Sequence, residues 1–300
     1  MPDTKQTTRR QYKTPETFFQ HKPTQVKVLG AGGTGGEVLD HLCRLNATLQ
    51  ALGHPGLHVT VYDGGIVKEA NVGRQRFSPN DVGQHKAPTL VSRINMFYGL
   101  KWEGIPFNWD GGHNDIAADL LISATDSAVS RHEIARVGDA SVQDDRHSFR
   151  YSPFGPNQRS KLWLDFGNDA HTGQAVLGLF GDPENGTHEQ GCPKLPHIID
   201  LYPDMAESVD DGPSCSVEEA IASQSFGVNA TLVANTFATI VWPLFRQGGT
   251  SVHGMFMDVA EGSVSPLHVD PTEWAMLGYN PEIESATDDT EPEQNTMTLS

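Results

Sequence analysis

The feature that most constrains the fold of this chain is a run of glycines between a short apolar segment and a helical pattern. Residues 26–29 are apolar apart from Lys27, and residues 30–36 contain five glycines. The apolar residues that follow recur at spacings of three and four, which indicates one face of a helix; they are Val38, Leu42, Leu45, Leu49 and Leu52. A strand, a glycine turn and a helix therefore follow one another directly.

Two further apolar segments each end on an acidic residue. Residues 58–63 end on Asp63, and residues 119–126 end on Asp126. Strand, glycine turn, helix and second strand form a βαβ unit, so we expect a parallel sheet. In open α/β sheets ligands bind at the carboxyl ends of the strands, where these acids and the glycine loop would meet. The predicted fold class is α/β, with a Rossmann-like, mostly parallel sheet and a glycine-rich loop.

The second half of the chain carries a different pattern. Residues 161–178 predict an antiparallel β extension, and residues 252–269 predict a hairpin. Between them lie a crossover loop rich in glycine, proline and aspartate (181–214) and a long apolar helix (216–245), with a kink expected near Gly227.

These patterns divide the chain into three parts. Residues 1–24 are polar and predict an arm on the surface or on a partner subunit. Residues 25–280 form the predicted domain. Residues 281–300 are acidic and predict a disordered tail.

The composition limits the partners and the compartment. The chain has 38 acidic and 21 basic residues, and its formal net charge of −17 argues against nucleic-acid binding through a basic face. The composition and the lack of an N-terminal apolar signal segment predict a cytoplasmic protein that does not bind membranes. The three cysteines include no C-x-x-C pair, so we expect neither a disulfide framework nor zinc.

The glycine cluster fits the spacing G-x-G-x-x-G and predicts a phosphate-binding loop. A side chain there would block the approach of the backbone to a phosphate, and the N-terminus of the following helix favours an anion. The candidate residues are Gly30, Gly32, Gly33 and Gly35. A tight turn without a ligand is the alternative. The motif leaves the nucleotide open, since Asp63 suits the ribose of NAD or of ATP.

Two cations and an acid favour ATP. Arg74 and Lys86 follow the second strand, where a triphosphate that loses pyrophosphate needs positive charge to neutralise the leaving group. Asp126 is a candidate Mg²⁺ ligand, because Mg²⁺ takes one or two carboxylates together with phosphate oxygens. An ordinary solvated pair is the alternative for Arg74 and Lys86.

Four motifs together resemble the ThiF/MoeB/ubiquitin-activating superfamily. They are GAGGTG, then D-x10-R-Q from Asp63, then D-x-G-x-x-K-A ending at Ala87, then A-T-D-S with Arg131 five residues after Asp126. The resemblance is strong over residues 25–135. Within the superfamily the phrases LDFGN, KLPHIIDLYP and PSCSVEEAI resemble the ThiF-like members of bacterial PRTRC systems.

The resemblance implies an activity and partners. Such enzymes use ATP and Mg²⁺ to adenylate the C-terminal glycine of a ubiquitin-like or sulfur-carrier protein. It therefore implies a small β-grasp partner that ends in glycine. A conjugating carrier and a JAB-type peptidase are further expected partners, and the chain itself is expected to be a homodimer. In some relatives an N-terminal arginine reaches the partner's site, and Arg9 and Arg10 are the candidates here.

The resemblance also assigns roles by position. Asp63 would hold the ribose, Arg74 and Lys86 would neutralise the triphosphate, and Asp126 would bind Mg²⁺. The other ATP-binding candidates are Asn71, Gln75, Ser127 and Arg131. The sequence departs from the family pattern twice, because Gly65 stands where a second acid is usual and Ser127 stands where asparagine is usual.

The cysteines and the acidic crossover have separate interpretations. Cys43 reads as a buried small hydrophobe, whereas Cys192 has no evident partner. Cys215 is a candidate thioester nucleophile at a helix start, although neighbouring acids disfavour its thiolate and a structural role is the alternative. Seven acids lie between Asp200 and Glu219. They predict a solvated face, or one that steers a basic C-terminus into the site.

Two other functions stay open at this point. An NAD-dependent oxidoreductase fits the glycine loop and Asp63 but leaves Arg74, Lys86 and Asp126 unexplained. A non-catalytic nucleotide-binding scaffold of the same fold fits the two departures, Gly65 and Ser127. Exchange of labelled pyrophosphate into ATP separates an adenylating enzyme from a dehydrogenase.

Overall fold

The computed structural model describes residues 10–19, 21–110, 118–148, 162–181, 194–207 and 227–280. Its centre is one eight-stranded sheet with the strand order β10-β9-β7-β6-β5-β2-β3-β4. The strands are β2 (Thr24–Leu29), β3 (Leu57–Tyr62), β4 (Glu103–Ile105), β5 (Leu120–Ser123), β6 (Leu162–Asn168), β7 (Thr172–Leu179), β9 (Val252–Asp258) and β10 (Ser263–His268).

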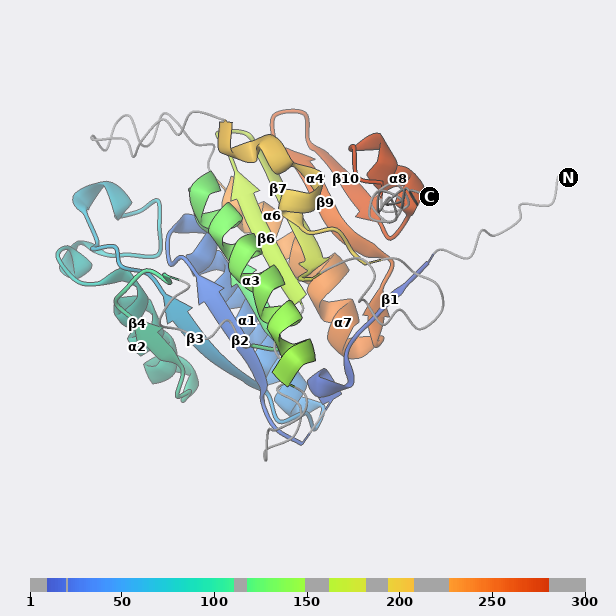
Figure 1. Ribbon diagram of the computed structural model, residues 1–300. Helices are drawn as coiled ribbons and strands as arrows, with labels where there is room; N and C mark the ends of the chain where they lie inside the picture. The colour runs from blue at the N-terminus through green and yellow to red at the C-terminus, as the bar shows by residue number, and fades with distance from the viewer. Residues whose placement is uncertain are drawn as a thin grey trace, which may run out of the picture.

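The N-terminal half is a parallel sheet with a change of direction at its centre. From β2 the chain runs outward through β3 to β4, and it then returns so that β5 pairs with the other side of β2. The connecting helices are α1 (Gly33–Ala51), α2 (Lys86–Tyr98) and α3 (Ala128–Ser148). Helices α1 and α3 cover opposite faces (Figure 1). Ligands bind at such a switch point in open α/β sheets.

The C-terminal half is antiparallel. Strand β6 pairs with β7, β7 with β9, and β9 with β10, all in antiparallel register. The predicted α/β fold, with an antiparallel extension and a hairpin over residues 252–269, is confirmed. One detail differs: β6 also pairs in parallel with β5, so it belongs to both halves.

The helical segment predicted at residues 216–245 is described from Gly227 onward. Gly227 has φ +83°, a conformation that glycine adopts readily, and the helix begins directly after it. It continues as α6 (Val228–Thr236), a π-helical turn (Phe237–Val241) and α7 (Trp242–Arg246). Residues Val228–Arg246 are long and apolar enough to cross a membrane, but half of that stretch is buried in the fold, as in the core helix of a globular domain.

Smaller elements complete the described chain. Of the predicted crossover (181–214), residues 181 and 194–207 are described; residues 182–193 and 208–214 lie outside the described part. These smaller elements are β1 (Tyr12–Lys13), β8 (Gly249–Thr250), α4 (Ile198–Leu201), α8 (Pro271–Met276) and the 3-10 turns Glu16–Phe19, Glu69–Asn71, Pro79–Asp81 and Pro203–Glu207.

Part of the segment predicted to be a polar arm is packed into the domain. Strand β1 pairs with β8, and the ring of the fully buried Phe18 lies 5.0 Å from that of Phe245. The hydroxyl of Thr14 donates to the carbonyl of Leu244 at 2.7 Å. Residues 12–19 therefore cover the end of α7, whereas residues 1–9 lie outside the described part.

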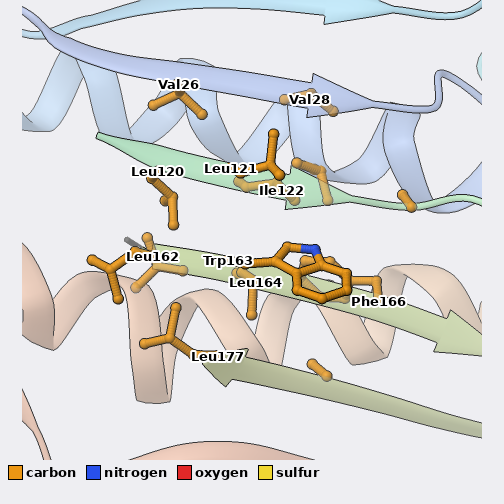
Figure 2. Packing of buried hydrophobic residues seen from close by; sticks show 14 of the residues in the cluster. Val26, Val28, Leu120, Leu121, Ile122, Leu162, Trp163, Leu164, Phe166 and Leu177 are labelled. Carbon is orange, nitrogen blue, oxygen red and sulfur yellow. The ribbon is translucent and has the colours of Figure 1, made fainter. Parts of the chain in front are cut away.

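The core follows the central strands. Buried side chains on β2, β5, β6 and β7 pack between the sheet and its helices (Figure 2). Strands covered on both faces are apolar at nearly every position, which explains the unbroken runs in this sequence. The largest fully buried side chains in the described part of the chain are Trp163 and Trp274, and the Nε1–H of Trp163 donates to the hydroxyl of Ser123 at 2.7 Å.

Candidate functional site

The carboxyl ends of four neighbouring parallel strands form the candidate site. Gly30 follows β2, Asp63 follows β3, Asp126 lies in the loop after β5, and Asn168 ends β6. Since these strands are adjacent and parallel, the four residues share one edge of the sheet. Three of them were predicted from the sequence, and Asn168 was not.

The glycines of the loop have different structural roles. Gly30 has φ +102°, and a β-carbon placed on it would lie 2.5 Å from the carbonyl oxygen of Ala124. A β-carbon on Gly35 would lie 2.1 Å from the carbonyl oxygen of Gly30. On Gly32 the nearest atom would be Nε2 of Gln75, at 3.8 Å. Gly30 and Gly35 are thus needed for packing of the loop, whereas Gly32 keeps an open surface.

Helix α1 begins at this loop with its first amides available. Gly32 is the N-cap residue, and as a glycine it has no side chain that could accept a hydrogen bond from these amides. Uncapped N–H groups and the helix dipole favour an anion at such an end. The first turn of α1 is therefore suited to a phosphate group.

Asp63 fastens the glycine loop to the loop after β3. Its Oδ2 accepts a hydrogen bond from the backbone N–H of Ala31, and its Oδ1 accepts one from that of Gly65, both at 2.7 Å. Each carboxylate oxygen has a second lone pair, so both still have capacity to accept a ribose hydroxyl.

The segment with Arg74 and Gln75 turns back onto the glycine loop. Oδ1 of Asn71 accepts a hydrogen bond from the backbone N–H of Lys68 at 2.8 Å. The backbone carbonyl of Asn71 accepts one from the backbone N–H of Gln75 at 2.9 Å. This turn brings the amide of Gln75 next to Gly32, and the half-buried Arg74 is part of the same turn. The structure therefore brings Gln75 to the glycine loop, and Asn71 and Arg74 belong to the same turn.

Lys86 opens helix α2 beside Asp63. Its N–H donates to the carbonyl of Gly65 at 3.0 Å. A β-carbon on Gly65 would lie 3.4 Å from Cδ of Lys86 and 2.8 Å from Oδ1 of Asp63. Glycine at position 65, where the family pattern has a second acid, is explained by this contact, because a side chain there would crowd the carboxylate of Asp63.

Asp126 and Ser127 lead into helix α3. Asp126 is exposed, and the hydroxyl of Ser127 accepts a hydrogen bond from the N–H of Ser130 at 3.3 Å. Serine is a favoured N-cap residue, so Ser127 caps α3 where the family pattern has asparagine.

Arg131 lies behind this loop and is buried. Its Nε–H donates to the fully buried carboxylate of Asp165 at 2.9 and 3.0 Å, and its Nη2 donates to the carbonyl of Phe166 at 2.9 Å. This differs from the nucleotide contact predicted for Arg131, because these partners turn the guanidinium toward the core.

Three polar residues at the site were missed by sequence reasoning. Oδ1 of Asn168 accepts a hydrogen bond from the hydroxyl of Thr34 at 2.8 Å. Nδ2 of Asn229 would lie 2.6 Å from a β-carbon on Gly33, and Thr125 precedes Asp126. Asn168 had one detectable signal, its place at the end of an apolar strand. Thr125 had a signal too, since it precedes Asp126 in the A-T-D-S motif, whereas Asn229 had none, because only the folded chain brings it to the loop.

Several buried polar atoms at the loop lack a hydrogen-bond partner in the described structure. They are Oε1 of Gln75, the hydroxyl of Thr125 and Oδ1 of Asn229. Buried polar groups are normally hydrogen-bonded. Such a concentration of unpaired groups around one loop is consistent with a polar ligand there.

A metal ion at this edge would need ligands from a bound nucleotide in addition to those from the protein. The described residues contain no cluster of three His, Cys, Asp or Glu side chains suited to a metal ion. Asp126 is a single carboxylate, which suits Mg²⁺ when phosphate oxygens supply other ligands. The absence of zinc stays a prediction.

The remaining sequence candidates are only partly described. Cys43 is buried, and burial raises the pKa of its thiol to about 12, so it is an inert core residue. Cys192, Cys215 and Arg9 lie outside the described residues. Arg10 is exposed, and its charge contributes to the lowered pKa of Asp270, after the backbone N–H of Thr272 as the main cause.

Comparisons with known proteins agree with this arrangement. Residues 15–155, nearly half of the chain, match the ThiF family. No curated protein matches the sequence. Among solved structures, E. coli MccB is similar with a TM-score of 0.54 and 14% identity over 85% of this chain and 65% of MccB. MccB with MccA-N7isoASN gives a TM-score of 0.53 and 16% identity over 84% of this chain and 66% of that one.

This chain covers slightly less than two thirds of the length of these structures. At this identity the likeness shows the fold, a Rossmann-like α/β sheet of the ThiF type. The family match covers the glycine loop, Asp63, Arg74, Lys86 and Asp126. The sequence match to the ThiF family thus covers residues 15–155, and the chain as a whole shares its fold with MccB.

Proposed function

We propose that this chain is an ATP-dependent adenylating enzyme that activates the C-terminal carboxylate of a small ubiquitin-like protein. The observation that carries the proposal is the convergence on the glycine loop. Lys86 lies beside Asp63, and Gln75 faces Gly32 from the turn that contains Arg74. A dinucleotide held only by its pyrophosphate needs no cations there, whereas a reacting triphosphate does.

Each group has a role in the proposed reaction. The open surface at Gly32 and the first amides of α1 receive phosphate oxygens, and Asp63 receives the ribose. An oxygen of the substrate carboxylate forms a bond to the α-phosphorus, and the bond from that phosphorus to the bridging oxygen breaks. Pyrophosphate leaves with the electron pair. Arg74 and Lys86 stabilise the charge that develops on it, so catalysis comes from positioning and charge neutralisation.

Asp126 is the proposed carboxylate ligand for Mg²⁺. When bound, Mg²⁺ would supply further positive charge to the phosphates. The residue is exposed at the strand edge and, within the described part of the chain, belongs to no cluster of three metal-ligand side chains, which fits an ion that is also held by the nucleotide.

The protein substrate is the finer part of the proposal. One similar structure is titled MccB with AMPCPP and MccA, and it has a TM-score of 0.52, 15% identity and coverage of 84% of this chain and 65% of that chain. A fold that holds a nucleotide analogue together with a second molecule is compatible with a β-grasp protein ending in glycine. Membership of the PRTRC group, a homodimer, a carrier and a JAB-type peptidase rest on the sequence resemblance alone.

A thioester step is proposed after adenylation. The thiolate of Cys215 would attack the acyl carbonyl, and AMP would leave, so that the activated carboxylate becomes a thioester. A thiol on a carrier protein is the alternative acceptor.

Pyrophosphate exchange tests the proposal. The purified chain is mixed with ATP, Mg²⁺, labelled pyrophosphate and a β-grasp protein ending in glycine, and label in ATP is measured. We expect exchange that requires both the partner and its terminal carboxylate, with a partner lacking its last glycine as the control. A chain that binds ATP without exchange supports the scaffold alternative, and one that binds NAD instead supports the oxidoreductase.

A further inference from the structure

One buried carboxylate binds both ends of the loop that carries Asp126. The loop consists of residues 124–127, between the end of β5 and the start of α3. On its N-terminal side, the hydroxyl of Ser123 donates to Oδ1 of Asp165. On its C-terminal side, the Nε–H of Arg131, in the first turn of α3, donates to both oxygens of the same carboxylate.

The groups around Asp165 are buried and well satisfied. Asp165 and Ser123 are fully buried, and Arg131 is 6% exposed. Arg131 also donates to the carbonyl of Phe166, and the indole of Trp163 donates to the hydroxyl of Ser123. Hydrogen bonds between ionised partners are stronger than neutral ones and fix geometry. The two ends of the loop are therefore held rigidly against β6.

The front of the loop is fixed by a separate contact. The N–H of Ala124 donates to the carbonyl of Leu29 at 2.8 Å, and Gly30 packs against the carbonyl of Ala124. The loop is thus set against β2 at one point and clamped at both ends by Asp165. Asp126 is left as the exposed side chain on a backbone that cannot move freely.

A buried ion pair by itself is a weak source of stability, because desolvation of the two charges offsets much of their attraction. A role in orienting the loop explains the presence of this ion pair better than a role in stability. Groups that orient a metal ligand without touching the metal usually matter to the affinity for that metal.

We propose that Asp165 and Arg131 are positioning residues that orient Asp126 toward the Mg²⁺ carried by the bound nucleotide. This rests on the proposed function. It assigns Arg131 a place behind the site, in contrast to the direct nucleotide contact that the sequence predicts.

The test measures binding of the non-hydrolysable nucleotide AMPCPP by calorimetry, in Mg²⁺ and in EDTA. The gain in affinity given by Mg²⁺ is the readout. Asp165→Asn removes the charge, and the double variant Arg131→Met with Asp165→Leu removes both charges and keeps the volume. We expect the gain to fall by about 10-fold in each variant, at the low end for groups that orient a metal ligand, with affinity in EDTA unchanged.

Two controls separate positioning from stability. Glu133→Gln with Arg136→Met removes an ion pair on the surface of the same helix, in which Nη2 of Arg136 lies 2.6 Å from Oε1 of Glu133. This variant is expected to keep the full gain. In an Asp126→Asn background, Asp165→Asn is expected to cause no further loss, because both changes act on one ligand.

Three results overturn the proposal. A folded Asp165 variant with the wild-type gain removes the positioning role, and an equal loss in Mg²⁺ and EDTA points to a nucleotide contact or a general defect. If Asp165→Asn does not fold, the double variant decides alone. Wild-type protein that does not bind AMPCPP at all refutes the proposed function, and this inference with it.

Discussion

Replacement of single loop glycines by alanine separates the glycine that faces a ligand from the glycine that packs the loop. In the structure, the nearest atom to a β-carbon on Gly32 would be 3.8 Å away, which is ordinary contact. On Gly35 the β-carbon would lie 2.1 Å from the backbone oxygen of Gly30, which no side-chain rotation relieves. The two substitutions add the same methyl group, so their difference isolates its surroundings.

The expected magnitudes follow from these distances. Gly35→Ala forces the backbone of the loop to shift, and overpacking of this kind costs about 1–3 kcal/mol or more. At about 2–4 °C per kcal/mol for a chain of this size, the melting temperature falls by roughly 2–12 °C. Gly32→Ala alters only the N-cap of α1, where alanine is less favourable than glycine by about 1 kcal/mol.

Ligand binding is expected to reverse this order of severity. The methyl group of Gly32→Ala occupies the surface that a phosphate would approach, so we expect binding of Mg²⁺ and ATP to weaken by about 10-fold or more, as for loss of about 1.4 kcal/mol. Melting curves and calorimetry on both variants provide the assay, with Gly53→Ala as a positive-φ control away from the site. Nucleotide affinity of Gly32→Ala equal to wild type would refute the reasoning.

Three other predictions concern charge, sulfur and pH. Arg74→Ala is expected to lower pyrophosphate exchange by about 10²–10³-fold with an unchanged melting temperature, because it removes one stabiliser of developing charge; exchange near the wild-type rate contradicts this. Cys215→Ala is expected to keep exchange and to lose a thiol-sensitive adduct with the β-grasp partner, since adenylation needs no thiol; survival of the adduct assigns the thioester elsewhere. Burial lowers the pKa of His253 from 6.5 to about 4, so its contribution to the free energy of unfolding is present above pH 6.5 and is lost as the pH falls toward 4. Denaturant titrations at several pH values across that range give the free energy of unfolding, and its rise with pH is expected to be smaller for His253→Gln, whose amide retains an acceptor for the indole N–H of Trp274. An unchanged dependence of that free energy on pH contradicts the assignment.

The parallel half of the fold was predictable because its signals are local. The glycine run, the helical stripe and the acid that ends the next strand lie within about forty residues, and each reports on its own backbone. The edge of the sheet that holds Gly30, Asp63 and Asp126 follows from strand direction alone. The positions of Arg74 and Lys86 near that edge came from the resemblance and the spacing.

The parts that escaped prediction depend on pairs far apart in the sequence. Arg131 and Asp165 are separated by 34 residues, and no pattern in the sequence says that β6 lies next to β5. Once β6 is known to be parallel to β5, Asp165 is placed behind the site and Asn168 beside it. Asn229 belongs to a helix whose placement over α1 is set by packing of the whole domain.

The N-terminal segment that closes onto α7 bears on where this chain can be shortened. Thr14 and Leu244, joined by a hydrogen bond, lie 230 positions apart. A protein that begins at residue 20 would lose the buried rings of Tyr12 and Phe18 and uncover Phe245. The strand Gly249–Thr250 would also lose its pairing partner and become an open edge, which can recruit a strand from another molecule. Trimming what looks like a dispensable polar leader would thus favour self-association.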